Sequence, residues 1–339
     1  MQKEKTKGGS MPKIKAIFKN KTITLFFILV AMCILLGIAN PKFFLYQNLM
    51  SLSRVVAYTS VIAIAELFVI LIAGIDLSVG AVCGLGAVMS TMLFVKYQVP
   101  LVPSIAVALI AGGVVGACNG GMIIGLRLPP FIATMGSTQI IKSLALLLTN
   151  GKPIIGVSAA FLAIGQGTFL FIPIAVWILA VVAVIFSILL NKTVTGRRLY
   201  ALGGGAEAAK FSGIKINKLT MFSYLVSGCM AALCGVILAA RMGSAQGATG
   251  AGYEMDAIAS VIIGGASFSG GEGKISGTII GACIMSVIRN ALVMLAVSTY
   301  LQSMIIGFII VIAVAIDQFR KYSATKTEKR IIAATMAGK

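Results

Sequence analysis

A carboxylic acid, Glu66, stands in the middle of the apolar run IAELFVILIAG. An unpaired carboxylate is costly in an apolar environment, so such a group binds a proton, pairs with a cation or hydrogen-bonds a polar molecule. Lys142 and Arg289 also lie within apolar runs and are the cations that could pair with it. The residues therefore allow three roles for Glu66: a neutral acid, a structural ion pair or a contact to a polar solute.

A polar turn signal, GIDLSVG, follows this run and ends at Gly80. Gly74 can end the preceding helix, and Asp76 can cap the next one by accepting hydrogen bonds from the amides near Ser78 and Val79. The segment predicts two helices joined by a tight turn. A structural cap is one interpretation of the motif, and contact with a ligand is the other.

No other pattern supplies the groups of an enzyme. The chain has no histidine. The glycine-rich stretch before Lys274 fails the pattern of a phosphate-binding loop, because Phe268 and Ile275 stand where a glycine and a Ser or Thr are required. The six cysteines lie in apolar runs without metal-ligand spacing: Cys33, Cys83, Cys118, Cys229, Cys234 and Cys283. We predict no catalytic residue and no metal or cofactor on this chain, which must take its energy from a partner or a gradient.

The elements that position these residues are membrane-spanning helices. The chain has 339 residues, of which 59% are hydrophobic and 11% charged, with a mean hydropathy of +1.03. Lipid must be its solvent, and runs of this length without alternation exclude a β-barrel. We expect an all-α polytopic protein with eight to ten spans, because the eighth run is too short to cross alone and is a broken or re-entrant element. The apolar runs are 23–40, 56–73, 78–95, 101–125, 131–148, 169–190, 219–240, 256–266, 276–296 and 300–316.

The net charge of +19 is concentrated in three places. Seven Lys/Arg lie in residues 1–21, six in 191–218 and six in 317–339. With ten spans and both termini cytoplasmic, inside segments carry 21 Lys/Arg and outside segments five, as the positive-inside rule requires. We expect basic cytoplasmic tails at 1–21 and 319–339 around one transmembrane domain, 22–318. The clusters lack the interleaved aromatic residues of nucleic-acid binding and favour contact with membrane lipid.

Small residues recur at a spacing that lets helices approach closely. Three sets of glycines are four positions apart: Gly112, Gly116 and Gly120; Gly121 and Gly125; Gly277 and Gly281. Such faces pack backbone against backbone. They predict either a sliding or dimer interface, or packing within one bundle.

Three separated segments together resemble a known family: GIDLSVG, residues 196–218 (GRRLYALGGGAEAAKFSGIKINK) and residues 240–282. In this order, and over nearly the whole chain from 24 to 318, they look like the permease subunits of ribose, xylose, allose and autoinducer-2 importers. These are ATP-binding-cassette transporters of the branched-chain, binding-protein-dependent superfamily. The wording of the first motif leans toward the ribose or allose type.

The resemblance implies a fold and a set of partners. Family permeases are dimers with the type II architecture of the vitamin B12 importer, placed in the bacterial cytoplasmic (inner) membrane. Two cytoplasmic ATPase subunits use ATP and magnesium on their behalf, and a periplasmic or lipid-anchored binding protein delivers the sugar. The expected function is translocation of a ribose- or allose-like monosaccharide by a homodimer. The sequence leaves the particular sugar open.

The resemblance also places a coupling helix, which docks into the ATPase, in loop 191–218 between spans six and seven. By motif it comprises Glu207, Ala208, Ala209, Lys210 and Phe211, with Gly213 turning the chain out of it. Physical reasons agree, because an acid at a helix start and a base one turn later complement the helix dipole, and alanines allow close docking. An ordinary solvated loop helix is the alternative.

Further polar residues are candidates by position alone. Hydroxyl-compatible side chains in the spans could line the solute pathway: Glu66, Asn119, Gln139, Asn290 and Gln302. Charges in the external segments could guide the binding protein: Arg54, Arg241, Glu254 and Asp256.

Two alternatives to sugar import stay open. A permease of the same class for an amino acid or nucleoside fits the same motifs. An ion-coupled secondary carrier would act alone, but it needs more ionisable groups within the membrane than this sequence has.

Overall fold

The computed structural model describes residues 21–337, without the side chains of Ile316, Arg320, Lys321 and residues 323–337. The predicted N-terminal basic tail therefore lies outside the described residues, apart from Lys21. Of these described residues, 78% are helical. Its described part has eight helices that are long and apolar enough to cross a membrane, and a shorter apolar helix, Val79–Val95. The predicted all-α polytopic class is confirmed at this level.

The first half of the chain alternates long helices with short connections. Its elements are α2 Lys21–Ala39, the 3₁₀ helix η1 Pro41–Phe44, α3 Tyr46–Leu71, α4 Val79–Val95, α5 Leu101–Gly125, α6 Pro130–Thr149, β1 Ile154–Ile155 and α7 Ala159–Gln166.

The second half of the described chain contains three short helices as well as four more long ones. Its elements are β2 Thr168–Phe169, β3 Ile172–Pro173, α8 Ile174–Lys192, α9 Val194–Gly204, α10 Ala206–Phe211, α11 Ile216–Met242, β4 Ser244–Ala245, α12 Tyr253–Ile263, α13 Ile275–Met294 and α14 Thr299–Ala337.

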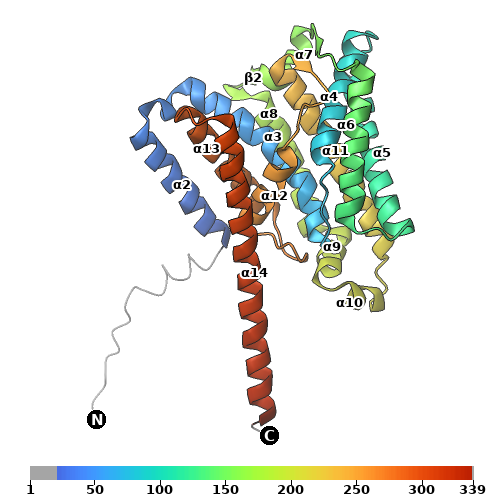
Figure 1. Cartoon of the computed structure of the whole chain (residues 1–339), viewed down its shortest axis with the longest axis vertical. Helices are drawn as coiled ribbons and strands as arrows, with labels where there is room; N and C mark the ends of the chain where they lie inside the picture. Colours follow the sequence, from blue (N-terminus) through green and yellow to red (C-terminus); the bar gives the residue numbers. More distant parts are fainter. Residues whose placement is uncertain (1–20, 338–339) are drawn as a thin grey trace.

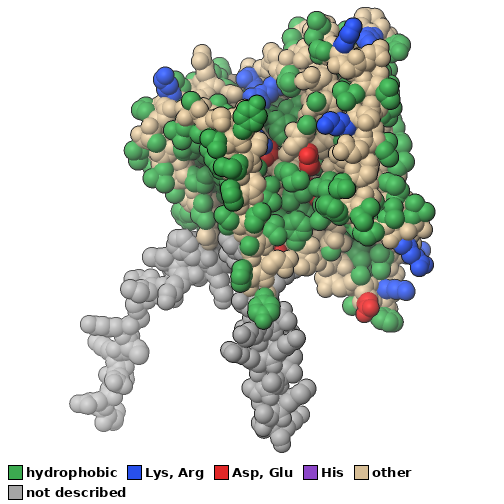
Figure 2. Space-filling model, viewed as in Figure 1, with side chains coloured by type: hydrophobic (Ala, Val, Ile, Leu, Met, Phe, Trp, Pro, Cys, Tyr) green, Lys and Arg blue, Asp and Glu red, His purple; other side chains and the backbone are tan. Residues whose placement is uncertain are grey.

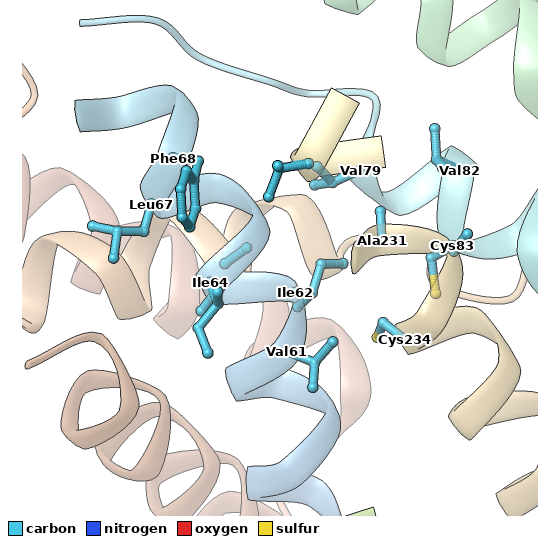
Figure 3. Packing of buried hydrophobic residues seen from close by; sticks show 14 of the residues in the cluster. Val61, Ile62, Ile64, Leu67, Phe68, Val79, Val82, Cys83, Ala231 and Cys234 are labelled. Atoms are coloured by element: carbon cyan, nitrogen blue, oxygen red, sulfur yellow. The ribbon is translucent and has the colours of Figure 1, made fainter. Parts of the chain in front are cut away.

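Two helices form the centre of the bundle. Most residues of α3 and α11 are buried, whereas no residue of α2 and few of the described residues of α14 are. Figure 3 shows Ile62 and Phe68 of α3 in one cluster with Val82 of α4 and Ala231 of α11. Helices predominate because lipid offers no hydrogen-bond partners, so each backbone amide must be satisfied within its own segment.

The two ends of the bundle carry different elements. In Figure 1, α9 and α10 lie at the end where α2 begins and toward which α14 extends, and α7 and β2 lie at the opposite end. Two antiparallel pairs of short strands, β1 with β4 and β2 with β3, supplement the helices.

Several predicted boundaries were wrong. The second span begins at Tyr46 rather than residue 56, because the polar residues before it still belong to the helix. The sixth begins at Ile174 rather than 169, because the β2–β3 hairpin turns through Leu170 and Phe171, whose φ angles are positive. The last helix continues far beyond residue 316.

The eighth apolar run forms a discontinuous element. The helix α12 has only 11 residues, and the non-helical residues 243–252 precede it. Glycines at 243, 250 and 252 adopt the left-handed conformation that such a chain path needs. This irregular segment packs against α4 and α6, since the surroundings of Gly247 and Gly250 include Leu146 and Cys83. Irregular backbone at membrane depth is tolerated where protein encloses it.

Candidate functional site

The GIDLSVG segment forms a buried turn between α3 and α4. The left-handed residue that ends α3 is Ala73, with φ of 60°, and not the expected Gly74. Position 74 needs a glycine because there is no room for a side chain. A Cβ there would lie 2.8 Å from the Tyr224 hydroxyl oxygen. The turn is therefore pressed against α11 as well as reversing the chain.

Asp76 is the acceptor at the centre of a hydrogen-bonded network, which we call the Asp76 network. Its Oδ1 accepts from the Ser78 amide at 3.0 Å and from the Ser78 hydroxyl, and its Oδ2 accepts from the Ser227 hydroxyl at 2.8 Å. The Asn119 amide donates to Ser78 Oγ at 2.8 Å. Asp76 does not occupy the predicted N-cap position of α4, which is taken by Ser78. The network joins the turn to α5 and α11.

Glu66 belongs to the same network. Its Oε1 accepts from the Asp76 amide at 3.1 Å, ten positions along the chain, and its Oε2 has no partner among the described residues. The side chain is completely buried. Neither predicted cation pairs with it, because Arg289 bonds to Asp256 and Lys142 makes no ion pair within 4 Å in the described chain.

The carbonyl of Ile75 is also satisfied by distant side chains. It accepts from Thr134 of α6 and Tyr224 of α11, both at 3.3 Å. Together with the Asp76 network, these bonds tie α3, α4, α5, α6 and α11 at one turn. A turn held from five helices positions those helices relative to each other.

Sequence reasoning missed Tyr224 and Ser227. The two residues lie three positions apart on one face of α11, within an apolar run, and this spacing was the available signal. Their acceptors, the Ile75 carbonyl and the Asp76 carboxylate, are about 150 residues away in sequence, which no local pattern reveals.

The remaining pathway candidates do not join the network. Asn290 exchanges hydrogen bonds with Asn48, and Gln302 donates to the carbonyl of Val297 at 2.8 Å. Gln139 is exposed on α6. The structure thus brings together Glu66 and Asn119 out of the five candidates.

The four residues expected to meet a binding protein separate into two pairs. Arg54 donates to the carbonyl of Gln166 at 2.8 Å, and Arg241 donates to the Tyr58 hydroxyl at 2.9 Å, near α7. Asp256 is buried, with 1% exposed, and forms an ion pair with Arg289 at 2.7 Å. It is therefore unavailable for an external contact, because α12 runs into the bundle.

Glu254 is half-buried and lies at the start of α4, away from the external end of that helix. A Cβ on Gly80, in the first turn of α4, would overlap its carboxylate. The expectation of an external position was wrong for both acids because it treated residues 243–256 as an external loop, whereas this segment descends along α4.

The glycine repeats fall into two groups, those that pack against another helix and those that have no neighbour among the described residues. Cβ atoms on Gly112 and Gly116 would overlap backbone oxygens of α11, and one on Gly281 would overlap the Ser260 oxygen of α12. Gly121 and Gly125, by contrast, have nothing within 4 Å of such an atom. The first and third sets serve packing within one bundle.

The predicted coupling segment forms an exposed helix, α10. Of its residues, Ala209 is buried, while Glu207, Ala208, Lys210 and Phe211 are exposed. Phe211 is 91% exposed. Gly213 follows with φ of 75°, and its amide donates to the Lys210 carbonyl at 3.0 Å, which ends the helix as the sequence indicated.

A tight joint lies behind α10. Gly203 of α9 packs so closely on the end of α3 and on the loop before α13 that a Cβ would overlap the Leu71 carbonyl oxygen and the Gly271 amide. The Gly271 amide donates to that same carbonyl at 3.0 Å. Tyr200 donates to the Gly273 carbonyl at 2.7 Å, and burial raises the pKa of its phenol. The joint connects the exposed helix to α3, only a few residues before the Asp76 network.

Within residues 21–337, no three side chains of His, Cys, Asp or Glu lie together as metal ligands would. Residues 48–314 match the family described as "Branched-chain amino acid transport system / permease component". The chain belongs to this family.

Several relatives of this permease have a sugar in their names. It is 38% identical to the ribose import permease protein RbsC of Haemophilus influenzae over 299 residues, covering 87% of this chain and 92% of the relative. It is 41% identical to RbsC of Bacillus subtilis, with 86% and 90% covered, and 36% identical to the D-allose transport system permease protein AlsC of Escherichia coli, with 89% and 93% covered. No solved structure matches the chain.

Membership and the long apolar helices together identify a multi-pass protein of the inner membrane. The permease is a transport component and not an enzyme. The relatives agree with the predicted family, including the leaning to the ribose and allose types.

Proposed function

We propose that the chain is the permease subunit of an ATP-driven importer for a ribose- or allose-like monosaccharide. It works with cytoplasmic ATPase subunits that bind and hydrolyse ATP with magnesium, and with an external sugar-binding protein. The relatives named for ribose and allose, which it matches over most of its length, support the solute class.

The single observation that carries the link to an ATPase is the exposure of α10. An aromatic side chain that is 91% exposed gains nothing within its own chain and can fill a pocket on a partner. The exposed Ala208 allows close approach, and Glu207 and Lys210 offer charges of both signs. We assign α10 as the coupling helix on this basis.

The route from α10 into the membrane follows the tight joint. A displacement of α10 moves α9, which contacts it directly. Gly203 of α9 then transmits the displacement to the backbone of α3 at Leu71. Because the contact is backbone on backbone, it transmits displacement with little slack. From Leu71 the chain enters the turn held by the Asp76 network, so movement there re-orients α4, α5 and α11 together.

The same arrangement supports an orientation and an assembly. We place α9, α10 and both termini in the cytoplasm, because loop 191–218 carries six Lys/Arg. A homodimer of type II architecture, with two copies enclosing a central passage, is the assembly we propose. At the opposite end, Arg54 and Arg241 remain our proposed contacts for the binding protein.

The test compares two exposed phenylalanines at opposite ends. Phe211→Ala should reduce co-purification of the ATPase about tenfold and slow ATP-driven uptake of labelled ribose to match, since buried aromatic anchors dominate interfaces. Phe171→Ala, at an equally open position of 85% exposed, should leave ATPase binding unchanged. The level of permease in the membrane should stay the same in both variants.

Other outcomes would identify the alternatives. Uptake by the purified chain alone, driven by a proton or sodium gradient, would indicate a secondary carrier. ATP-driven uptake of an amino acid or a nucleoside, with no uptake of ribose or allose, would correct the solute class. Unchanged ATPase binding in Phe211→Ala would place the docking helix elsewhere.

A further inference from the structure

Two charged side chains, Lys142 of α6 and Glu254 of α12, lie at membrane depth. Lys142 is twelve positions after Pro130, so it lies roughly 18 Å along a 20-residue helix. Glu254 lies against Gly80. The helix α4 continues from there to Val95, which is roughly 22 Å. Lys142 therefore lies well inside its helix, and Glu254 lies far from the end of α4 at Val95.

The two side chains face one small cavity of about 70 Å³. The cavity is open, and its lining combines Lys142, Thr138 and Glu254 with small residues that include Gly80 and Gly247. The Thr138 hydroxyl donates to the Thr134 carbonyl at 2.8 Å, which leaves its oxygen free to accept. Donors and acceptors thus converge on one space between α4, α6 and α12.

Lys142 and Glu254 act on each other electrostatically, but neither forms an ion pair within 4 Å among the described residues. The ion pairs within 4 Å among the described residues are Lys21 with Glu272 and Arg289 with Asp256. Lys142 is exposed. Glu254 accepts one hydrogen bond, from the Gly252 amide at 3.1 Å, and a carboxylate can accept several more.

The surrounding surface is apolar. Figure 2 shows acidic and basic side chains in the middle of a face that is otherwise largely hydrophobic or uncharged. On α6, Ile140 and Leu147 are 67% and 72% exposed, as residues in contact with lipid or with another chain would be. A charge at this depth is strongly disfavoured in lipid, so the face with Lys142 and Glu254 must meet water or protein.

We propose that Lys142 and Glu254 form a contact site for the transported solute on the wall of the passage. The inference rests on the proposed function, in which a second copy of the chain closes the passage. The ammonium donates hydrogen bonds to hydroxyl oxygens, and the carboxylate accepts from hydroxyl protons. Because the two charges cancel, the site suits an uncharged solute with several hydroxyl groups and not an ion.

The position of these side chains is tested by labelling. Cysteines introduced by Lys142→Cys and Glu254→Cys should react with a charged, water-soluble methanethiosulfonate reagent. Ile140→Cys is the matched control on the same helix and should react at least tenfold more slowly. The unsubstituted chain gives the background from its own six cysteines.

Their role is tested by uptake in the assembled importer. In Lys142→Gln and Glu254→Gln, ATP-driven uptake of labelled ribose should fall about tenfold, with ATPase binding unchanged, since each loses a charged hydrogen bond to the solute. The double exchange of Lys142→Glu with Glu254→Lys keeps the charges but reverses donor and acceptor. A structural ion pair would recover wild-type uptake in this variant, and a solute contact site would not.

The outcomes separate the two proposals. Wild-type uptake in both single variants, recovery by the double exchange, or equal labelling of Ile140→Cys and Lys142→Cys would each overturn the contact site. Absence of ribose uptake or of ATPase binding in the unsubstituted protein would instead contradict the proposed function. In that case the labelling still decides, because equal reaction at the three positions would show that no water-filled wall exists here.

Discussion

The permease contains two polar regions at membrane depth, and they are built in opposite ways. In the Asp76 network, the acid finds its donors within the same chain and is 1% exposed. Lys142 and Glu254 face an open cavity without an ion-pair partner within 4 Å in the described chain. Polar groups whose hydrogen-bond partners lie within the chain fix the positions of the helices. Polar groups without such partners point to a partner outside the chain.

The two acids of α12 repeat this contrast over a distance of two residues. Asp256 faces α13 and is held by Arg289, while Glu254 faces α4 and α6 and the open cavity. Successive positions two apart on a helix point in nearly opposite directions. The helix α12 thus carries Asp256, which is in an ion pair, toward the interior. It carries Glu254, which has no ion-pair partner within 4 Å among the described residues, toward the cavity.

The largest expected effect concerns the packing that brings Asn119 to Ser78. Gly116→Ala would press a methyl group into the Tyr224 carbonyl and force α5 away from α11, at a cost of about 3 kcal/mol. Gly121→Ala has open space and should cost nothing, because alanine favours a helix over glycine. Unfolding of the purified permease by SDS in mixed micelles measures both. Equal stability of the two variants would show that α5 does not pack as described.

An intermediate effect is expected at Asp76, the acceptor at the centre of the Asp76 network. Asp76→Ala leaves the Ser78 amide and the Ser227 hydroxyl without an acceptor and should reduce the free energy of unfolding by about 2 kcal/mol. Ser227→Ala removes one donor only and should cost about 1 kcal/mol. The same unfolding assay ranks them. A loss in Ser227→Ala as large as that in Asp76→Ala would mean that the acid is not the centre of the network.

The smallest effect is expected at Glu66. Glu66→Gln keeps the oxygen that accepts from the Asp76 amide and removes a carboxylate whose second oxygen has no partner among the described residues. Stability should change by less than about 0.5 kcal/mol, and ribose uptake should stay at the wild-type rate. A strong loss of uptake with stability retained would indicate that Glu66 belongs to the transport pathway and not only to the Asp76 network.

Much of the fold could be predicted from local sequence. Each of the ten apolar runs became a helix, including the short α12, because length and hydropathy decide insertion in lipid. The helix expected over Glu207–Phe211 from the family motif lies within α10, and Gly213 follows it with a positive φ, as a glycine tolerates.

The partners of the polar residues could not be predicted in the same way. Asp256 was expected outside and lies in an internal ion pair, and Arg289 was a possible partner of Glu66 and belongs to Asp256. Charge alone does not choose between such pairings. The choice depends on which helices are neighbours, and that is a property of the whole bundle.

The sequence by itself determined which runs form apolar helices and which loop is basic. Only the tertiary structure decided which faces meet. In lipid, a face toward another helix and a face toward acyl chains are equally apolar, so hydropathy does not distinguish them. Gly116 and Gly121 illustrate the point, because one is enclosed by α11 and the other is open. The enclosed Asp76 and the open Glu254 could be told apart only once the helices were packed.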